Sequence, residues 1–318
     1  MPARESTSLH DKQLLLRLFG EVTDEELDQI LAVTEQLVFE TGRYVFHQGD
    51  RENALYIVLS GRLRVLNETA EGVRILGDVT EGEPVGEFSL FTKEPRSASV
   101  VAIRRSVVLE MDEGDYQTLI IRFPGLAHTL TRFVIDRLRR NAFQKNRTAA
   151  PKNIALVNLQ STNDLLAWAP FMQQQFMDMG IQTQVYDHRS LPEYQSQELF
   201  EQMEQLDGLN FLICDEQHEA WAHQCIVYCD LVVLVADFHA DPGPYALESR
   251  LQLHHRDILH RNMYLLLLHR EDAGLPRHTS RWYQNRNIDL HIHLRMNNER
   301  DIRRFCRIAS HRATGLVL

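Results

Sequence analysis

Residues 85–100 read VGEFSLFTKEPRSASV, and the chemistry of this stretch decides the class of the first half of the chain. Arg96 carries a planar guanidinium that can donate paired hydrogen bonds to an anion, with more direction than a lysine. Glu87 can accept a hydrogen bond from a hydroxyl group, and Gly86 lets the backbone approach a ligand closely. The backbone amides of residues 88–90 can face the anion if a helical turn begins there. The stretch therefore predicts a site for a phosphate group beside a sugar hydroxyl.

This stretch resembles the phosphate-binding cassette of the cyclic-nucleotide-binding domain family, because the spacing from Gly86-Glu87 to Pro95-Arg96 is preserved without a gap. Five residues upstream also match the β-roll pattern of that family: Gly49, Asp50, Tyr56, Val58 and Gly61. The resemblance implies a cyclic nucleotide as the ligand, with Arg96 at the phosphate and Glu87 at the ribose 2′-hydroxyl. The alternative is a roll without a ligand, in which Glu87 and Arg96 form an ion pair.

The resemblance also supplies the rest of the predicted contact set. Ser97 places a hydroxyl beside Arg96. A hydroxyl at this position is found in cGMP sites and also in bacterial cAMP receptors. We expect cAMP as the ligand, and cGMP is the alternative. Leu76 and Val85 should wall the base, and the helix after the roll should cover it near Asn141 and Ala142. The complete predicted set is Gly86, Glu87, Phe88, Ser89, Arg96, Ser97, Ala98, Leu76, Val85 and Asn141.

The sequence around the cassette consists of short apolar runs separated by glycines, which is typical of an all-β roll, sandwich or barrel. The predicted strands lie in residues 43–46, 55–59, 63–66, 73–76 and 99–110. Before them, residues 11–35 are predicted to be helical, with Thr23 and Glu26 as a capping box. After them, residues 115–144 predict a helix broken at Phe123-Pro124-Gly125. Its second part carries an apolar stripe that predicts a homodimer contact or burial against another domain: Leu126, Leu130, Phe133, Val134 and Leu138.

The second half of the chain has a different pattern, in which apolar strands are mostly separated by helical stretches. The predicted strands are residues 154–159, 182–186, 211–214, 231–236, 263–269 and 290–294, and a last helix covers about 298–310. This alternation predicts a doubly wound, mostly parallel α/β domain. The predicted domains are 1–34 (helices), 35–145 (β-roll with lid helix), 146–152 (linker), 153–312 (α/β domain) and 313–318 (the start of a patatin domain).

No catalytic site is predicted in the α/β half. Its first strand is followed by residues 158–163, NLQSTN, without a Gly-Lys-Ser/Thr phosphate loop, and no Gly-x-Ser-x-Gly elbow occurs. Two other strand ends present carboxylates that would repel phosphate, at Asp215-Glu216 and at Asp237. Cys225, Cys229 and the nearby His223 are interpreted as packing residues and not as metal ligands, as are the pairs His254-His255 and His291 with His293.

The arrangement as a whole resembles the N-terminal regulatory half of bacterial patatin-like phospholipases related to neuropathy target esterase. The stretches that carry this resemblance are residues 153–159, 230–237, 281–282 and 311–318. It implies that the roll senses a cyclic nucleotide and regulates a lipid-hydrolase domain downstream in the same chain. The Ser–Asp dyad and the glycine-rich oxyanion loop of such hydrolases are not found in these residues, so we expect hydrolysis only in a longer parent. The alternatives are a stand-alone ligand-responsive interaction protein and an α/β enzyme of unrecognised type, and a transcription regulator is less expected.

The charge and composition of the chain count against several further classes of protein. The formal net charge of −10 counts against a general binder of DNA or of anionic membranes, although basic residues cluster between Arg132 and Arg147. No apolar run reaches the roughly 18 residues that span a bilayer. Residues 1–10 are polar, without the apolar stretch of a signal peptide, and the four cysteines show no disulfide spacing. We therefore expect a cytoplasmic chain without a catalytic cofactor or metal.

Overall fold

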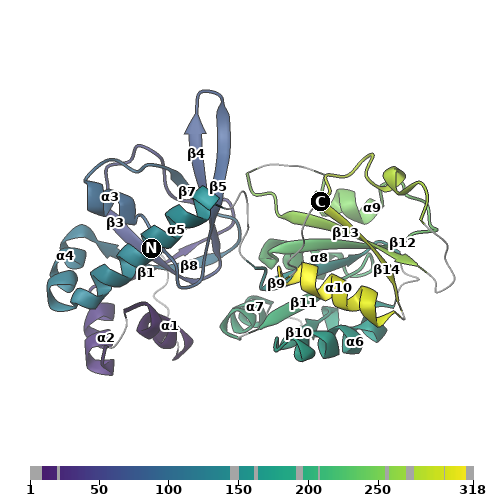
Figure 1. Cartoon of the computed structure of the whole chain (residues 1–318), viewed down its shortest axis with the longest axis horizontal. Helices are drawn as coiled ribbons and strands as arrows, with labels where there is room; N and C mark the ends of the chain where they lie inside the picture. The colour runs from purple at the N-terminus through teal and green to yellow at the C-terminus, as the bar shows by residue number, and fades with distance from the viewer. Residues whose placement is uncertain are drawn as a thin grey trace. The chain divides into compact units, whose positions relative to one another are not determined.

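The computed structural model describes residues 9–19, 22–143, 150–160, 164–190, 196–206, 208–254, 258–269, 276–296 and 298–312. The chain divides into two compact units, Met1–Ala149 and Ala150–Leu318 (Figure 1). None of the described helices combines the length and apolar character that a membrane span requires.

The first unit begins with two helices, α1 (Leu9–Phe19) and α2 (Asp24–Ala32). The predicted capping box is confirmed, because Thr23 Oγ1 accepts from the Glu26 amide at 3.3 Å and the Glu26 carboxylate accepts from the Thr23 amide at 2.8 Å. Each bond satisfies a backbone donor that a helix start leaves unpaired.

The β-roll consists of two four-stranded antiparallel sheets, with strand orders β1-β8-β3-β6 and β2-β7-β4-β5. Their strands are β1 (Glu35–Phe39), β2 (Tyr44–Phe46), β3 (Ala54–Ser60), β4 (Arg62–Thr69), β5 (Gly72–Thr80), β6 (Pro84–Val85), β7 (Ser99–Ala102) and β8 (Ser106–Asp112). The prediction of one strand over residues 99–110 is wrong. β7 pairs with β2 and β4, whereas β8 pairs with β1 and β3, so the chain changes sheet at residues 103–105.

Three helices complete this unit: α3 (Glu87–Thr92), α4 (Glu113–Arg122) and α5 (Pro124–Phe143). The predicted break is confirmed, and Pro124 is the first residue of α5, where its missing amide is not needed. Leu126 and Leu130 of α5 are completely buried in one cluster with Leu15 and Phe19 of α1. These two residues of the stripe are therefore unavailable for a dimer contact, and the homodimer remains a prediction.

The second unit is a doubly wound sheet of six parallel strands in the order β10-β11-β9-β12-β13-β14. The strands are β9 (Asn153–Asn158), β10 (Thr183–Tyr186), β11 (Leu209–Cys214), β12 (Leu231–Asp237), β13 (Asn262–His269) and β14 (Leu290–Arg295). All six predicted strands are found. They alternate with α6 (Leu165–Asp178), η1 (His188–Ser190), α7 (Ser196–Gln205), α8 (Glu219–Tyr228), α9 (Ala246–Arg250), η2 (Thr279–Trp282) and α10 (Glu299–Ala309).

Helices cover both faces of this sheet, which explains why its four inner strands, β9, β11, β12 and β13, are buried along almost their whole length. On one face, α6 and α10 bury Trp168, Phe176 and Phe305. On the other, α7, α8 and α9 bury residues that include Phe200 and Trp221. All strands run the same way, so their carboxyl ends form one edge of the sheet, the edge at which such folds place ligand sites.

Candidate functional site

The predicted phosphate-binding stretch folds as a tight turn into α3. Gly86, the residue before the helix, has φ +88°, a conformation that favours glycine. A Cβ atom at this position would lie 2.5 Å from Arg96 Nη1 and 2.7 Å from the carbonyl oxygen of Ala54. The turn therefore requires glycine both for its backbone angle and for the close approach of the arginine.

We expect Gly86→Ala to destabilise the first unit and to weaken ligand binding at Arg96. The positive φ costs an alanine about 1–2 kcal/mol, and the contact with the carbonyl of Ala54 adds to this cost. Thermal unfolding followed by circular dichroism measures the effect. Gly72→Ala is the control, since φ there is +133° but no atom lies within 4 Å of the added Cβ. An equal loss in both variants would contradict the role of the close contact.

Arg96 is held rigidly inside the roll. Its side chain is 3% exposed, and its guanidinium donates to the carbonyl oxygens of Gly86 (2.9 Å) and Ala54 (2.8 Å) and to Ser89 Oγ (2.8 Å). The ring of Phe46 lies 4.1 Å from the guanidinium carbon. These contacts fix the plane of the guanidinium before any ligand arrives, which lowers the cost of ordering it on binding.

Two polar atoms of the cassette remain without a partner. Arg96 Nε and Glu87 Oε2 are both buried, and neither forms a hydrogen bond with a described residue. An orphaned buried donor or acceptor costs about 1–3 kcal/mol, so native proteins usually satisfy such atoms. The unpaired donor suits a phosphate oxygen, and the unpaired acceptor suits a ribose hydroxyl. The alternative of a Glu87–Arg96 ion pair is not found, since neither side chain bonds to the other.

Glu87 instead pairs with Arg137 of α5, a residue that the sequence did not single out for the site. Arg137 Nη1 lies 2.6 Å from Glu87 Oε1, and Nη2 donates to the carbonyl of Pro84. Burial raises the pKa of the Glu87 carboxyl above its usual value, and the positive charges of Arg137 and Arg96 offset part of this rise. Arg137 lies eleven residues after Leu126, which is about three helical turns. It is therefore on the same face of α5 as the buried Leu126 and Leu130. A cation on an apolar helix face is the signal that could have identified it.

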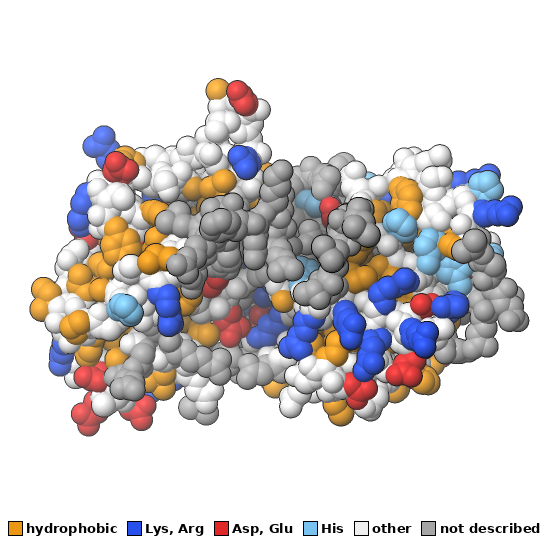
Figure 2. Space-filling view, viewed as in Figure 1, with side chains coloured by type: hydrophobic (Ala, Val, Ile, Leu, Met, Phe, Trp, Pro, Cys, Tyr) orange, Lys and Arg blue, Asp and Glu red, His pale blue; other side chains and the backbone are white. Residues whose placement is uncertain are grey.

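The other predicted contact residues lie in varied surroundings. Ser89, Val85 and Ala98 are buried, Phe88 is half-buried, and Ser97 is exposed. Leu76 lies on β5 in the β4–β5 hairpin, where Figure 2 shows hydrophobic side chains on the surface, and it is 40% exposed. The side chains of Asn141 and Ala142 lie outside the described residues, so the predicted cover of the base stays a prediction.

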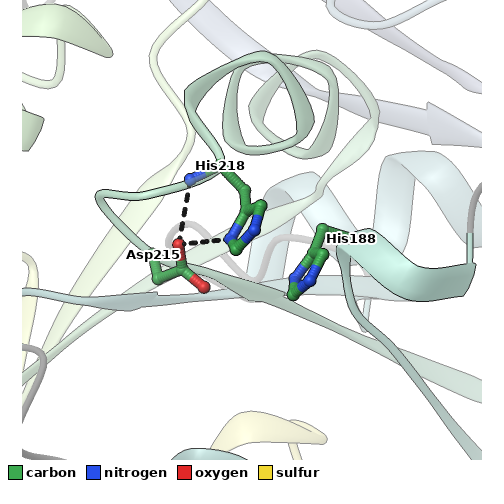
Figure 3. A group of neighbouring side chains, drawn as sticks. All are labelled: His188, Asp215 and His218. Atoms are coloured by element: carbon green, nitrogen blue, oxygen red, sulfur yellow. Dashed lines mark hydrogen bonds and ion pairs between the residues drawn. The ribbon is translucent and has the colours of Figure 1, made fainter.

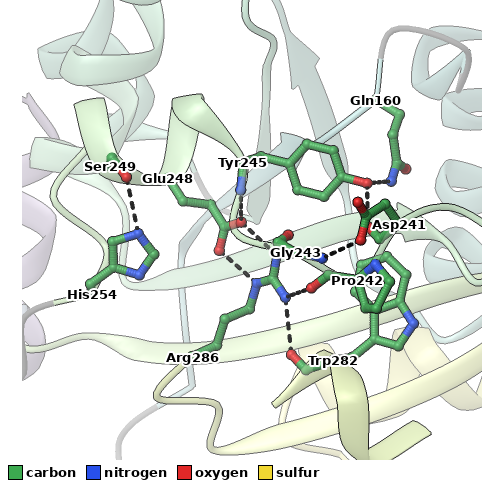
Figure 4. A network of polar contacts seen from close by, with 10 residues as sticks. All are labelled: Gln160, Asp241, Pro242, Gly243, Tyr245, Glu248, Ser249, His254, Trp282 and Arg286. Atoms are coloured by element: carbon green, nitrogen blue, oxygen red, sulfur yellow. Dashed lines mark hydrogen bonds and ion pairs between the residues drawn. The ribbon is translucent and has the colours of Figure 1, made fainter. Parts of the chain in front are cut away.

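In the second unit, the carboxyl edge near β9 and β12 is occupied by the chain's own side chains (Figure 4). Gln160 follows β9 and bonds to the amide of Asp237 (2.7 Å) and to the hydroxyl of Tyr245. Arg286 donates all five of its N–H groups, two of them to the buried carboxylate of Glu248 and three to backbone carbonyls. Arg286 therefore has no donor left for a ligand, and the network stabilises the loop between β12 and α9.

A histidine pair lies at the ends of β13 and β14. His269 Nε2 and His293 Nδ1 are 2.7 Å apart, and the second ring nitrogen of His293 lies 3.3 Å from Thr279 Oγ1. Burial is the main cause that lowers the pKa of His293 to about 4, and the positive charges of neighbouring histidines and Arg304 contribute. Burial and His239 likewise lower the pKa of His269.

We expect the second unit to lose stability as the pH falls from the ordinary histidine pKa of 6.5 toward about 4. In this window the unfolded chain takes up protons that the folded His293 does not, so unfolding is favoured; above 6.5 this effect is absent. Thermal unfolding across this pH range measures the effect, and His293→Gln should make the pH dependence shallower. His223→Gln is the matched control, because His223 is half exposed on α8. An unchanged pH dependence in His293→Gln would contradict the prediction.

The four cysteines are buried free thiols, at Cys214, Cys225, Cys229 and Cys306. Cys214, Cys225 and Cys229 belong to the apolar cluster under α7, α8 and α9, and burial raises the pKa of Cys225 well above its usual value. Thiols in this state pack as small apolar groups. The packing interpretation of Cys225 and Cys229 is consistent with these positions.

Comparison with known proteins defines the class of both units. Residues 36–123 match the cyclic nucleotide-binding domain family, and residues 158–314 match the Neuropathy Target Esterase family P-loop like domain. The chain thus joins a cyclic-nucleotide-binding domain to an α/β domain of the neuropathy target esterase family, as the sequence predicted. The second match includes the loop after β9, where this chain has Asn158-Leu159-Gln160 and no Gly-Lys-Ser/Thr motif.

Individual relatives divide in the same way. The cyclic AMP receptor protein of Thermus thermophilus is 37% identical over 123 residues, which are 38% of this chain and 57% of the receptor. Patatin-like phospholipase domain-containing protein 7 of Mus musculus is 26% identical over 298 residues, 84% of this chain and 22% of that protein. Lysophospholipase nte1 of Aspergillus oryzae is 24% identical over 287 residues, 79% of this chain and 18% of that protein. This chain therefore spans about a fifth of its phospholipase relatives.

Among solved structures, the catabolite activator protein of Thermus thermophilus is 29% identical, with a TM-score of 0.37 and coverage of 52% of this chain and 72% of that chain. A cyclic nucleotide-binding domain from Methylobacillus flagellatus is 21% identical, with a TM-score of 0.38 and coverage of 42% and 78%.

Proposed function

We propose that this chain is the cyclic-nucleotide-sensing regulatory part of a patatin-like serine phospholipase or lysophospholipase. The observation that carries the proposal is the pair of unpaired buried atoms in the cassette, Arg96 Nε and Glu87 Oε2. They are complementary to a phosphate and a ribose hydroxyl, the two polar groups that lie next to each other in a cyclic nucleotide. The names of the phospholipase relatives supply the class of the regulated enzyme.

Ligand binding acts on α5 through Glu87. The carboxylate of Glu87 already binds Arg137 of α5 through Oε1, and its unpaired Oε2 is the atom proposed to accept from the ribose. A ribose hydroxyl that donates a hydrogen bond to Glu87 changes the charge distribution and the orientation of this carboxylate. Both changes alter its ion pair with Arg137. The ligand can shift α5 only if it binds one arrangement of this pair more tightly than the other.

Titration of the whole chain with cAMP and with cGMP by isothermal calorimetry tests the proposed function. We expect saturable binding of at least one of the two nucleotides, because Arg96 and Glu87 are already ordered. Of the two, we expect cAMP to bind more tightly. Adenosine 5′-monophosphate is the control, since its phosphate is not closed onto the ribose and carries more charge. Absence of binding by either cyclic nucleotide at millimolar concentration would show that the roll is not a sensor.

The connection to a hydrolase has its own test. A protein that contains this chain followed by a patatin-like domain should hydrolyse lysophospholipid at a rate that depends on the cyclic nucleotide. If the roll binds the cyclic nucleotide and the rate of hydrolysis does not change, the nucleotide does not regulate the hydrolase.

A further inference from the structure

Three side chains with metal-binding chemistry meet at the carboxyl edge of the sheet of the second unit (Figure 3). His188 lies in the short turn η1 after β10, and Asp215 and His218 lie between the end of β11 and the start of α8. β10 and β11 are parallel neighbours, so the segments that follow them meet at this edge. Within the described part of the chain, this is the one group of His, Cys, Asp and Glu whose three ligand atoms lie within 4.8 Å of one another.

Two of the three groups are already held in place, because backbone amides bind the Asp215 carboxylate and this carboxylate contacts the ring of His218. Asp215 Oδ1 accepts from the amides of Gln217 (2.9 Å) and His218 (3.0 Å) and lies 2.9 Å from His218 Nδ1. These contacts define the turn that leads into α8. The carboxylate and the imidazole of His218 therefore face each other without any contribution from His188.

His188 is not needed by this turn, and yet its ring lies directly against that of His218. The ring centroids are 3.3 Å apart and the planes differ by 4°. The ring nitrogens of His188 form no hydrogen bond with any residue that the structure describes. An imidazole with free nitrogens beside a carboxylate–imidazole pair is a donor set that a transition metal can use.

We propose that His188, Asp215 and His218 bind a Zn²⁺ ion. The ion takes the place of the proton between His218 Nδ1 and Asp215 Oδ1, His188 supplies the third ligand, and water the fourth. Zinc binds imidazole nitrogen and carboxylate oxygen at about 2.0–2.2 Å in tetrahedral geometry. The rings of His188 and His218 are stacked in the structure, so the proposed coordination requires the His188 ring to rotate until one of its nitrogens faces the ion. His218 and Asp215 are about one-third exposed, so the ion has access from solvent.

The proposed ion connects the segment after β10 to the start of α8. Both ends of this connection are surface turns, and an ion that binds only the folded state stabilises them by mass action. The site is independent of the cyclic-nucleotide cassette, which belongs to the other unit.

Calorimetric titration of the whole chain with Zn²⁺, after removal of any affinity tag and bound metal, tests the proposal. We expect one saturable site per chain. His188→Ala, His218→Ala and Asp215→Asn should each weaken binding by at least about tenfold, since losing even a group that only orients a ligand costs 10–100-fold. Asp215→Asn keeps the oxygen that accepts from the two amides, so it removes the metal ligand charge without removing the turn. Visible absorption of the Co²⁺-loaded chain should show tetrahedral coordination that is lost in the same variants.

His223→Gln provides the matched control. His223 is on α8 and lies 3.7 Å from Glu219, so it forms a histidine–carboxylate pair without a third ligand. Its replacement should leave Zn²⁺ affinity unchanged. No saturable Zn²⁺ binding to the wild-type chain would overturn the proposal, as would wild-type affinity in folded His188→Ala or an equal loss in His223→Gln.

Discussion

Replacing Arg96 with alanine should remove measurable cyclic-nucleotide binding and also lower the free energy of unfolding of the first unit. A charge-assisted hydrogen bond contributes about 1.5–3 kcal/mol, which is roughly 10- to 150-fold in affinity, and the phosphate loses the bond proposed with Arg96 Nε together with the nearby positive charge. The fold loses contacts as well, because Arg96 donates to the carbonyl oxygens of Gly86 and Ala54. Those two buried acceptors would lose their charged partner. Calorimetric titration measures the binding, and thermal unfolding measures the stability.

Two further variants separate binding from folding. Arg96→Lys keeps the positive charge but cannot donate in a fixed plane, so we expect weakened but detectable binding and a smaller loss of stability. Arg74→Ala removes an exposed cation from β5 in the same unit and should change neither quantity. If Arg96→Ala remained folded and bound the ligand as the wild type does, the cassette would not be the phosphate site.

The elements of this chain could be predicted from local patterns because each pattern reflects a local cause. The capping box at Thr23 and the break at Pro124 depend on residues within one helical turn. The four inner strands of the second unit, β9, β11, β12 and β13, are buried on both faces, so they stand out as mostly apolar runs. The cassette is identified by its resemblance to the cyclic-nucleotide-binding domain family, because the short spacing from Gly86-Glu87 to Pro95-Arg96 is preserved without a gap.

The contacts that the sequence did not predict join residues far apart in the chain. Glu87 and Arg137 are separated by fifty residues, and His188 and His218 come from segments after different strands. Sequence spacing carries no information on which of several cations reaches a buried carboxylate. The sequence predicts one strand over residues 99–110 for a related reason: both halves of this run are apolar, and only their pairing partners show that they belong to different sheets.

Replacing Arg137 with glutamine should weaken cyclic-nucleotide binding by about tenfold and uncouple the roll from α5. The reason is the ion pair of 2.6 Å between Arg137 and Glu87, in which the carboxylate is almost completely buried. Removing one partner of such a pair leaves a buried charge without compensation, which affects both the carboxylate and the helix. Hydrogen exchange with and without ligand measures the coupling. In the wild type we expect ligand to protect the cassette, residues 124–143, and then β9 and β12.

The expected spread into the second unit follows from the length of the connection, since only residues 144–152 separate the end of α5 from β9. In Arg137→Gln the protection should stay within the cassette. Arg132→Gln is the matched control, because Arg132 is an exposed cation on the same helix, and its exchange pattern should equal that of the wild type. If ligand protects the roll and α5 in the wild type while β9 and β12 are unaffected, the two units respond independently. The second unit is then a spacer, and regulation of a downstream hydrolase through it is excluded.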